Sequence, residues 1–200
     1  MSHSVSEKKK AGYEYLLAYK VTVPVYDYTV LFCNIWIPKG SRTHDQMVQS
    51  ARSGMQNVAE GYAQGRLSGY ITLVGVAKGS LEELLNDYLS FARQRKLPIW
   101  EKGRVIREIG EIREIWGVLR RTPTLPDTPN FPDLPDDPEK AVNLLITLVY
   151  QAKYLQEKLY ASLLEKHRKE GGFHEKLLQD RMAFRNKGAW GTRGTKGGTK

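Results

Sequence analysis

The sequence predicts an all-α protein. Hydrophobic residues recur at the helical period of about 3.6 along nearly every segment, and no stretch alternates with a period of two for long enough to make a strand. Prolines and glycines separate these segments, as they commonly do between helices. Hydrophobic residues make up 40% of the 200 residues, which is enough to build a core.

The first helix follows a short apolar lead-in at residues 13–20. We expect this helix to begin at Thr22, because Pro24 is tolerated only in the first turn of a helix. Pro38 then ends the helix after Ile37.

Capping residues and helix breakers bound the next two helices. Thr43 or Asp45 is expected to cap a second helix that ends near Gly65. Ser68 is expected to cap a third helix that ends near Pro98.

A fourth helix is expected over residues 100–121. Its apolar side chains fall at helical spacing and form one stripe, which consists of Val105, Ile109, Ile112, Trp116 and Leu119. Such a stripe indicates that one face of this helix packs against a core.

Residues 122–138 form a proline-rich linker, with a proline at every third position. A period of three is that of the polyproline II helix, so the linker is expected to be an extended strut with its rings on one edge. Such a segment can act as a spacer or as a ligand for an aromatic-lined groove. We favour the spacer, because the basic flank that usually orients such ligands is absent.

A long fifth helix and a short last helix follow the linker, in a C-terminal region at 139–186. Asp137 and Pro138 are typical of an N-cap and a first helical residue, and apolar residues then continue at helical spacing to about Lys169. The Gly171–Gly172 pair ends this helix. The Gly-rich basic tail at 187–200 lacks the residues to form a core, and we expect it to be disordered.

The net charge of +9 favours an anionic partner, with nucleic acid first, although solubility alone also explains it. Five of the basic residues and no acidic residue lie after residue 184. Basic side chains at helix ends reach phosphates without being buried. The candidate nucleic-acid-binding residues are Lys39, Arg42, Arg52, Arg66, Arg193, Lys196 and Lys200.

Two rows of small and polar residues run beside the core faces of the second and third helices. The rows share the spacing 0, 4, 7 and 11 and consist of Ser50, Gly54, Asn57 and Gly61, and of Gly75, Gly79, Glu82 and Asn86. Small side chains let helices approach closely, either inside one chain or against another copy of it. We expect Asn57, Glu60 and Glu82 to form hydrogen bonds across that contact.

No pattern of catalytic or ligand-binding residues stands out. Glu60 and Glu82 could form a carboxylate pair with acid–base or metal chemistry, but no His, Cys or Asp accompanies them at ligand spacing. Cys33 lies in an apolar segment and is expected to be a buried thiol. We therefore expect no catalytic residue, no metal and no cofactor, and a protein that is not an enzyme.

The chain has no run of eighteen apolar residues, and its first residues lack the apolar stretch of a secretory signal. We therefore expect neither a membrane span nor a cleaved leader in this sequence, and residues 1–12 are interpreted as a flexible leader. A cytoplasmic location follows as an expectation.

Over about residues 15–115 the chain resembles a bacterial four-helix bundle family. This family includes proteins encoded in intervening sequences of ribosomal RNA genes and the accessory variability determinant of diversity-generating retroelements. The resemblance is carried by the runs QSARSGMQNVAEG and SGYITLVGVAKGSLEELLNDY, and within them by Ser50, Ala51, Arg52, Asn57, Ala59, Glu60, Gly61, Ala77, Gly79, Ser80, Leu81, Glu83 and Leu84. Residues 139–186 are similar to a suffix extension found on some members.

The resemblance implies an antiparallel four-helix bundle at 13–121 with an additional helical extension. It also implies a cyclic homo-oligomer, a pentamer, whose basic surface binds RNA and a reverse transcriptase. The function expected from the whole sequence is that of a non-enzymatic, oligomeric nucleic-acid-binding protein and a reverse-transcriptase accessory factor. The alternative is a protein–protein adaptor or structural assembly protein that uses the linker and the long fifth helix.

Overall fold

The structure is a computed structural model that describes residues 10–171 and 173–190, with the side chains of residues 177–185 in the last helix. All regular elements in these ranges are helices, so the predicted all-α class is confirmed. None of the described helices is long and apolar enough to cross a membrane.

The elements follow one another with short connections, except for the proline-rich linker. A 3-10 helix η1 (Gly12–Tyr15) comes first. The α-helices are α1 (Leu17–Lys20), α2 (Thr22–Trp36), α3 (Arg42–Ala63), α4 (Leu67–Gln94), α5 (Lys102–Glu108), α6 (Glu111–Arg121), α7 (Pro138–Glu170) and α8 (Phe173–Trp190).

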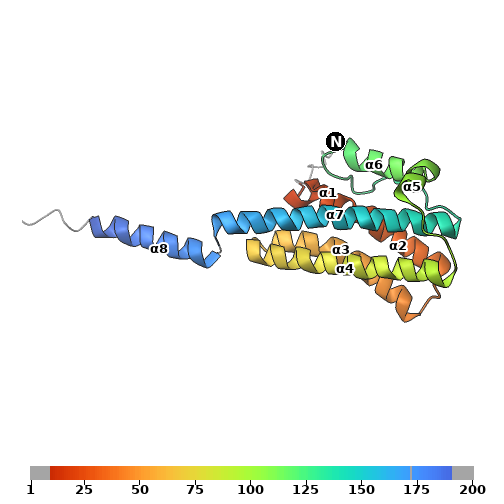
Figure 1. The fold of residues 1–200 in the computed structure, drawn as a ribbon. Helices are drawn as coiled ribbons and strands as arrows, with labels where there is room; N and C mark the ends of the chain where they lie inside the picture. Colours follow the sequence, from red (N-terminus) through yellow and green to blue (C-terminus); the bar gives the residue numbers. More distant parts are fainter. Residues whose placement is uncertain (1–9, 172, 191–200) are drawn as a thin grey trace, which may run out of the picture.

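Helices α2, α3, α4 and α7 lie side by side (Figure 1). Helices α3 and α4 are antiparallel, because the Ser53 hydroxyl contacts Ser80 at 2.9 Å and Ser50 donates to Glu83 at 3.3 Å. Helices α4 and α7 are antiparallel as well, with two ion pairs that join Glu82 to Lys153 and Lys78 to Glu157.

The first half of α7 is surrounded by the other helices. Residues 141–146 are all buried, whereas a helix on the surface of a protein buries only one stripe. Helices α1, α2, α4 and α5 all contact α7. The main hydrophobic core includes residues from Val21, just before α2, to Ala152 in α7.

Residues 100–121 do not form the continuous helix that the sequence predicted. The segment divides into α5 and α6, because Ile109 adopts an extended conformation (φ −111°, ψ 93°) and Gly110 begins the next helix. The apolar positions were nevertheless identified correctly, since Val105, Ile109, Ile112 and Leu119 are buried. Hydrophobic spacing therefore indicated burial but not the break.

Two expected caps are also wrong, whereas the third is confirmed. The side chain of Ser41, not of Thr43 or Asp45, caps α3 by accepting the backbone N–H of His44 at 3.2 Å. Ser68 lies inside α4, whose N-cap is Arg66. Asp137 caps α7 as expected, by accepting the backbone N–H of Glu139 at 3.0 Å.

The proline-rich linker lies on the helices, so it is not the extended free spacer that its composition predicted. Tyr28 donates a hydrogen bond to the carbonyl of Pro132 at 2.6 Å. The ammonium of Lys20, which is buried, donates to the carbonyls of Thr122 at 2.9 Å and Pro123 at 3.2 Å. Burial lowers the pKa of Lys20, and hydrogen bonds to these two carbonyls stabilise its positive charge.

Helix α7 shares the core of the helices that precede it, so the linker does not separate two cores. Helix α8 leaves the other helices at the end of α7 (Figure 1), and its described apolar side chains are exposed, among them Met182 and Phe184. It continues to Trp190, past residue 187 where the disordered tail was expected to begin. Residues 191–200 and 1–9 lie outside the described residues.

The row of small residues on α3 packs inside the protein. A Cβ added to Gly54 would lie 2.6 Å from Cδ2 of Leu81, and a Cβ added to Gly61 would lie 2.6 Å from Cδ2 of Tyr70. Gly54 also leaves its carbonyl open to the buried Gln156 of α7, whose amide donates to it at 2.7 Å. The α3 glycines therefore permit the close approach of α4.

The row on α4 has a different environment. A Cβ on Gly79 would meet nothing within 4 Å, and the nearest neighbour of one on Gly75 is Tyr160 at 3.7 Å. Glu82 is exposed and paired with Lys153, and Asn86 is exposed. This row thus takes no part in the contact with α3.

Within one chain, the expected polar contacts between the two rows do not form. Asn57 donates to the carbonyl of Ser53 at 3.0 Å and to its hydroxyl at 2.7 Å, within its own helix. Glu60 is exposed. The hydrogen bonds that cross from α3 to α4 come from Ser50 and Ser53.

The two glycine environments predict opposite effects of alanine. Gly61→Ala should lower the free energy of unfolding by about 1–3 kcal/mol, because the new Cβ would lie 3.3 Å from the backbone Cα of Tyr70 as well as against its ring. Gly79→Ala should raise it by about 0.5–1 kcal/mol through helix propensity alone. Urea denaturation of both variants measures the difference, and a stabilised Gly61→Ala would contradict the close packing.

Candidate nucleic-acid interface

A long groove lies between α7 on one side and α5 and α6 on the other. Its volume is about 1050 Å³. The residues that line it are Leu17, Ile99, Trp100, Lys102, Ile106, Ile112, Arg113, Trp116, Gly117, Arg120, Ile146, Thr147, Tyr150, Gln151, Tyr154 and Leu155. It is the largest of the hollows described for this protein.

Two helix faces with the same spacing form the walls. The lining residues of α7 fall at offsets 0, 1, 4, 5, 8 and 9 from Ile146, and those of α6 fall at offsets 0, 1, 4, 5 and 8 from Ile112. Residues at these offsets share one face of a helix. The side chain of Trp116 in α6 joins the walls, because its indole N–H donates to Gln151 of α7 at 2.7 Å.

A buried asparagine holds one end of the groove. The side-chain oxygen of Asn143 accepts the backbone N–H of Trp100 at 2.7 Å, and its amide donates to the carbonyls of Pro98 at 3.0 Å and Glu139 at 2.8 Å. The indole N–H of Trp100 donates to the carboxylate of Glu139 at 2.6 Å. These bonds fix the segment after α4 against the first turn of α7.

Each of four aromatic rings at the groove has a cation near its face. The guanidinium of Arg104 lies 3.8 Å from the ring centre of Trp100, and that of Arg120 lies 4.9 Å from the ring centre of Trp116. On α7 the ammonium groups of Lys153 and Lys158 lie 5.8 Å and 5.4 Å from the ring centres of Tyr150 and Tyr154. All four distances are within the range of cation–π attraction.

The charges in the groove have one sign. Lys102, Arg113 and Arg120 line it, and none of the described residues that line it is acidic. All three cations are exposed. An anionic or electron-rich partner therefore meets no like charge from the lining.

Two tyrosines leave their rings open to a partner. Tyr150 is 52% exposed and Tyr154 is 61% exposed, whereas Trp100 is buried and Trp116 is partly buried. The two tyrosines are four residues apart on α7, so they are neighbours on one face, about 6 Å apart along its axis. Neighbouring rings of this kind provide stacking platforms for successive bases.

The structure does not bring the sequence-predicted basic residues together. Lys39 and Arg42 lie at the beginning of α3, whereas Arg66 follows its end, about 30 Å away along the helix axis. Arg52 lies exposed in the middle of α3. The expected cluster on one side of the helix ends is therefore wrong for these four residues. Arg193, Lys196 and Lys200 lie outside the described residues.

Further basic residues, which the sequence analysis did not identify, lie near the beginning of α3. Because α3 and α4 are antiparallel, the end of α4 brings Arg93, Arg95 and Lys96 to the same end of the protein as Lys39 and Arg42. Arg95 is held there, since it donates to the carbonyl of Trp36 at 2.9 Å and lies 3.9 Å from the ring centre of Phe91. Cations also stabilise the C-terminal end of a helix such as α4, so these charges have a structural role.

The candidate carboxylate pair does not form. The antiparallel register places Glu60 and Glu82 about 13 Å apart along the helix axes, and Glu82 is paired with Lys153. The described ranges contain no group of three His, Cys, Asp or Glu residues that could hold a metal ion. The thiol of Cys33 is buried as expected, and burial raises its pKa to about 12, so it is a poor nucleophile at neutral pH.

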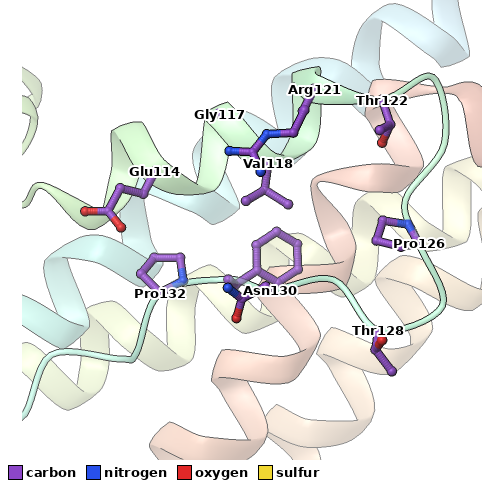
Figure 2. A pocket seen from close by; sticks show the side chains of 10 residues that line it. Glu114, Gly117, Val118, Arg121, Thr122, Pro126, Thr128, Asn130 and Pro132 are labelled. Carbon is purple, nitrogen blue, oxygen red and sulfur yellow. The ribbon is translucent and has the colours of Figure 1, made fainter.

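A smaller hollow of about 450 Å³ lies between α6 and the proline-rich linker. Figure 2 shows Glu114 and Arg121 on the α6 side and Pro126, Asn130 and Pro132 on the linker side. This hollow has one acidic and one basic group, without the run of exposed rings that the larger groove has. It is a gap left where the linker lies on α6.

Comparison of the chain with protein-family models, with curated proteins and with solved structures finds no match. The resemblance to the bacterial four-helix bundle family therefore stays a prediction.

A signal for the groove is present in the sequence. A cation follows three or four residues after each of the four rings, in the pairs Trp100–Arg104, Trp116–Arg120, Tyr150–Lys153 and Tyr154–Lys158. Within α6 and α7 this spacing places ring and cation on one helix face, whereas Trp100 lies just before α5, which carries Arg104. The four pairs come from three segments of the chain, and only the fold brings them together at the groove.

The role of Asn143 predicts a loss of stability when its amide is removed. Asn143→Leu should lower the free energy of unfolding by about 2 kcal/mol or more, because the backbone N–H of Trp100 and the carbonyl of Pro98 lose their buried partner. Asn86→Leu, at an exposed position of α4, should change it by less than about 0.5 kcal/mol. Equal midpoints of the two variants in urea would refute this role.

Proposed function

We propose that this protein binds single-stranded nucleic acid, RNA first, in the groove between α6 and α7, without a catalytic step. The observation that supports the proposal is the combination of exposed rings and cations in a groove whose lining has no acidic group. Tyr150 and Tyr154 would stack on two bases, and Arg113 and Arg120 would neutralise the neighbouring phosphates. The net charge of +9 favours the same partner.

The alternative is an adaptor that binds another protein in the same groove. Its supporting observation is the exposed aliphatic side chains at the rim, since Ile99 is 48% exposed and Ile106 is 39% exposed. Exposed aliphatic side chains contribute little to phosphate binding but would be buried by an apolar helix. Nucleic acid is favoured because a protein partner would need to be acidic as well as apolar to match the cations.

The architecture that we propose for this function is an antiparallel four-helix bundle of α2, α3, α4 and α7. This proposal differs from the sequence expectation, in which residues 100–121 provide the fourth helix. The exposed surface around Gly79 and Val76 of α4 is where a second copy would pack in the cyclic oligomer, a pentamer, that the resemblance implies. A reverse transcriptase as a further partner rests on the resemblance alone.

Removal of the two exposed rings should weaken RNA binding. Tyr150→Ala combined with Tyr154→Ala should raise the Kd for a labelled oligouridine strand by roughly tenfold or more, because each stacked base contributes about 1–3 kcal/mol. Tyr62→Ala, at an exposed tyrosine near the end of α3 that does not line the groove, is the matched control and should leave the Kd unchanged. Fluorescence anisotropy measures all three proteins, and equal affinities would exclude the groove.

The cations should set the salt dependence of the same binding. Arg113→Gln with Arg120→Gln should reduce the slope of log K against log salt by roughly 1.4, since each phosphate contact of a single strand contributes about 0.7. Lys39→Gln with Arg42→Gln should leave the slope unchanged. If the slope changed only in the variant with Lys39→Gln and Arg42→Gln, the binding site would lie at the beginning of α3 and not in the groove.

Point variants are needed here because a deletion would not leave a folded protein. A chain without residues 122–186 lacks α7 and would expose the core that α7 covers. Two results together would establish the adaptor instead. The parent protein would bind an acidic helical peptide but not oligouridine, and the combined variant Ile99→Ala with Ile106→Ala would lose the binding of the peptide.

A further inference from the structure

The side chains that line the groove offer mainly hydrogen-bond donors. The three cations, Lys102, Arg113 and Arg120, have no acceptor atom, and none of the described lining residues is acidic. The side-chain acceptors of the lining are the hydroxyl oxygens of one threonine and two tyrosines and the amide oxygen of Gln151. A ligand that accepts hydrogen bonds therefore matches this lining better than one that donates them.

The amide oxygen of Gln151 is already used by the opposite wall. It accepts the indole N–H of Trp116 at 2.7 Å. An indole N–H can only donate, so the atom that faces it must be the oxygen of the amide and not its nitrogen. The side chain of Trp116 therefore fixes which way the amide of Gln151 is turned, and the N–H₂ group remains as a pair of donors.

This N–H₂ group is free to bind a ligand. It makes no hydrogen bond to the described residues, whose one contact of this kind with the Gln151 side chain is that of Trp116. It is also open to solvent, because the buried side-chain atoms that lack a partner in the described ranges are Oη of Tyr70 and Oε1 of Gln156. Since Gln151 lines the groove, its amide provides an accessible donor there.

Gln151 lies beside both exposed rings of the groove. It follows Tyr150 directly and precedes Tyr154 by three residues, and residues three apart on a helix have Cβ atoms about 5–6 Å apart. Stacking on a ring holds a base by its face and leaves the edge of the base free. The edge of a base stacked on Tyr154 would therefore lie within reach of the Gln151 amide.

The two pyrimidine bases of RNA differ at that edge. Uracil has carbonyl oxygens at C2 and C4, whereas cytosine has an amino group at C4 in place of the second carbonyl. The amino group would meet donors in the groove, and a polar group that loses its partner on binding weakens the complex. The C4 oxygen of uracil would accept from Gln151 instead. Contacts with phosphates carry no sequence information, so this edge is where the two bases can be distinguished.

We propose that the groove selects uracil over cytosine, with the amide of Gln151 donating to the C4 oxygen of a base stacked on Tyr154. This preference rests on the proposed binding of single-stranded RNA, to which it adds the base that is recognised. Trp116 is a positioning residue for it, because an amide that could turn over would offer an acceptor as readily as a donor. The rings and the cations supply affinity, and Gln151 supplies specificity.

The parent protein provides the first test, by fluorescence anisotropy with labelled strands of equal length. The Kd for oligouridine should be lower than that for oligocytidine by roughly fivefold or more, the effect of one well-placed base contact. A strand of 2-pyrimidinone riboside, a uridine analogue without the C4 oxygen, should also bind more weakly than oligouridine. Both comparisons use the unaltered full chain.

Gln151→Glu separates the donor from the structural role of this side chain. The carboxylate still accepts the indole N–H of Trp116, but the N–H₂ group is gone. The added charge weakens the binding of all RNA, whereas the ratio of two Kd values measured on one variant compares the bases alone. That ratio should fall to about one or invert, because a carboxylate accepts from the amino group of cytosine. Gln94→Glu, at an exposed position of α4 outside the groove, adds the same charge and should keep the ratio of the parent protein.

The outcomes distinguish this preference from the proposed function. Equal affinity of the parent protein for oligouridine and oligocytidine would overturn the preference and leave RNA binding in place. An unaltered ratio in a folded Gln151→Glu variant would overturn it as well. If that variant does not fold, the analogue decides, since equal binding of the uridine and 2-pyrimidinone strands would exclude the C4 contact. Binding of none of these strands would overturn the proposed function and the preference with it.

Discussion

The structure depends on the burial of the first half of α7. Residues 141–146 contact other helices on every side, and apolar burial of this extent is a dominant favourable contribution to folding. The same segment carries Asn143, which holds the residues after α4 in place. One face of the following turns forms a wall of the groove. The candidate site is therefore positioned by this helix.

Close packing of α3 explains its glycines. An interior glycine costs a helix roughly 1 kcal/mol of stability relative to alanine, and this cost is offset when the space is filled by a neighbouring side chain. At Gly54 the space is taken by Leu81, and at Gly61 by Tyr70 and Leu73. In α4, Gly79 has no such neighbour. Glycines at the same spacing therefore pack against a neighbouring helix in α3, whereas Gly79 of α4 lies on an open surface.

The groove suits an anion that is a flexible chain. In the groove the exposed rings and cations would bind a flexible polyanion by stacking and charge, which tolerates many sequences. This arrangement depends on exposed residues such as Tyr154.

The sequence by itself determined the helical class, the bounds of α2 and α7, the capping role of Asp137 and the burial of Cys33. These features follow from local spacing, from proline and glycine positions and from the identity of single residues. Only the tertiary structure decided that α7 joins the core, that the helix over residues 100–121 is broken, and that the linker lies on the helices. It also decided which rings and cations meet in the groove. Such contacts join residues far apart in the chain, and hydrophobic periodicity states that a face is buried without stating which partner buries it.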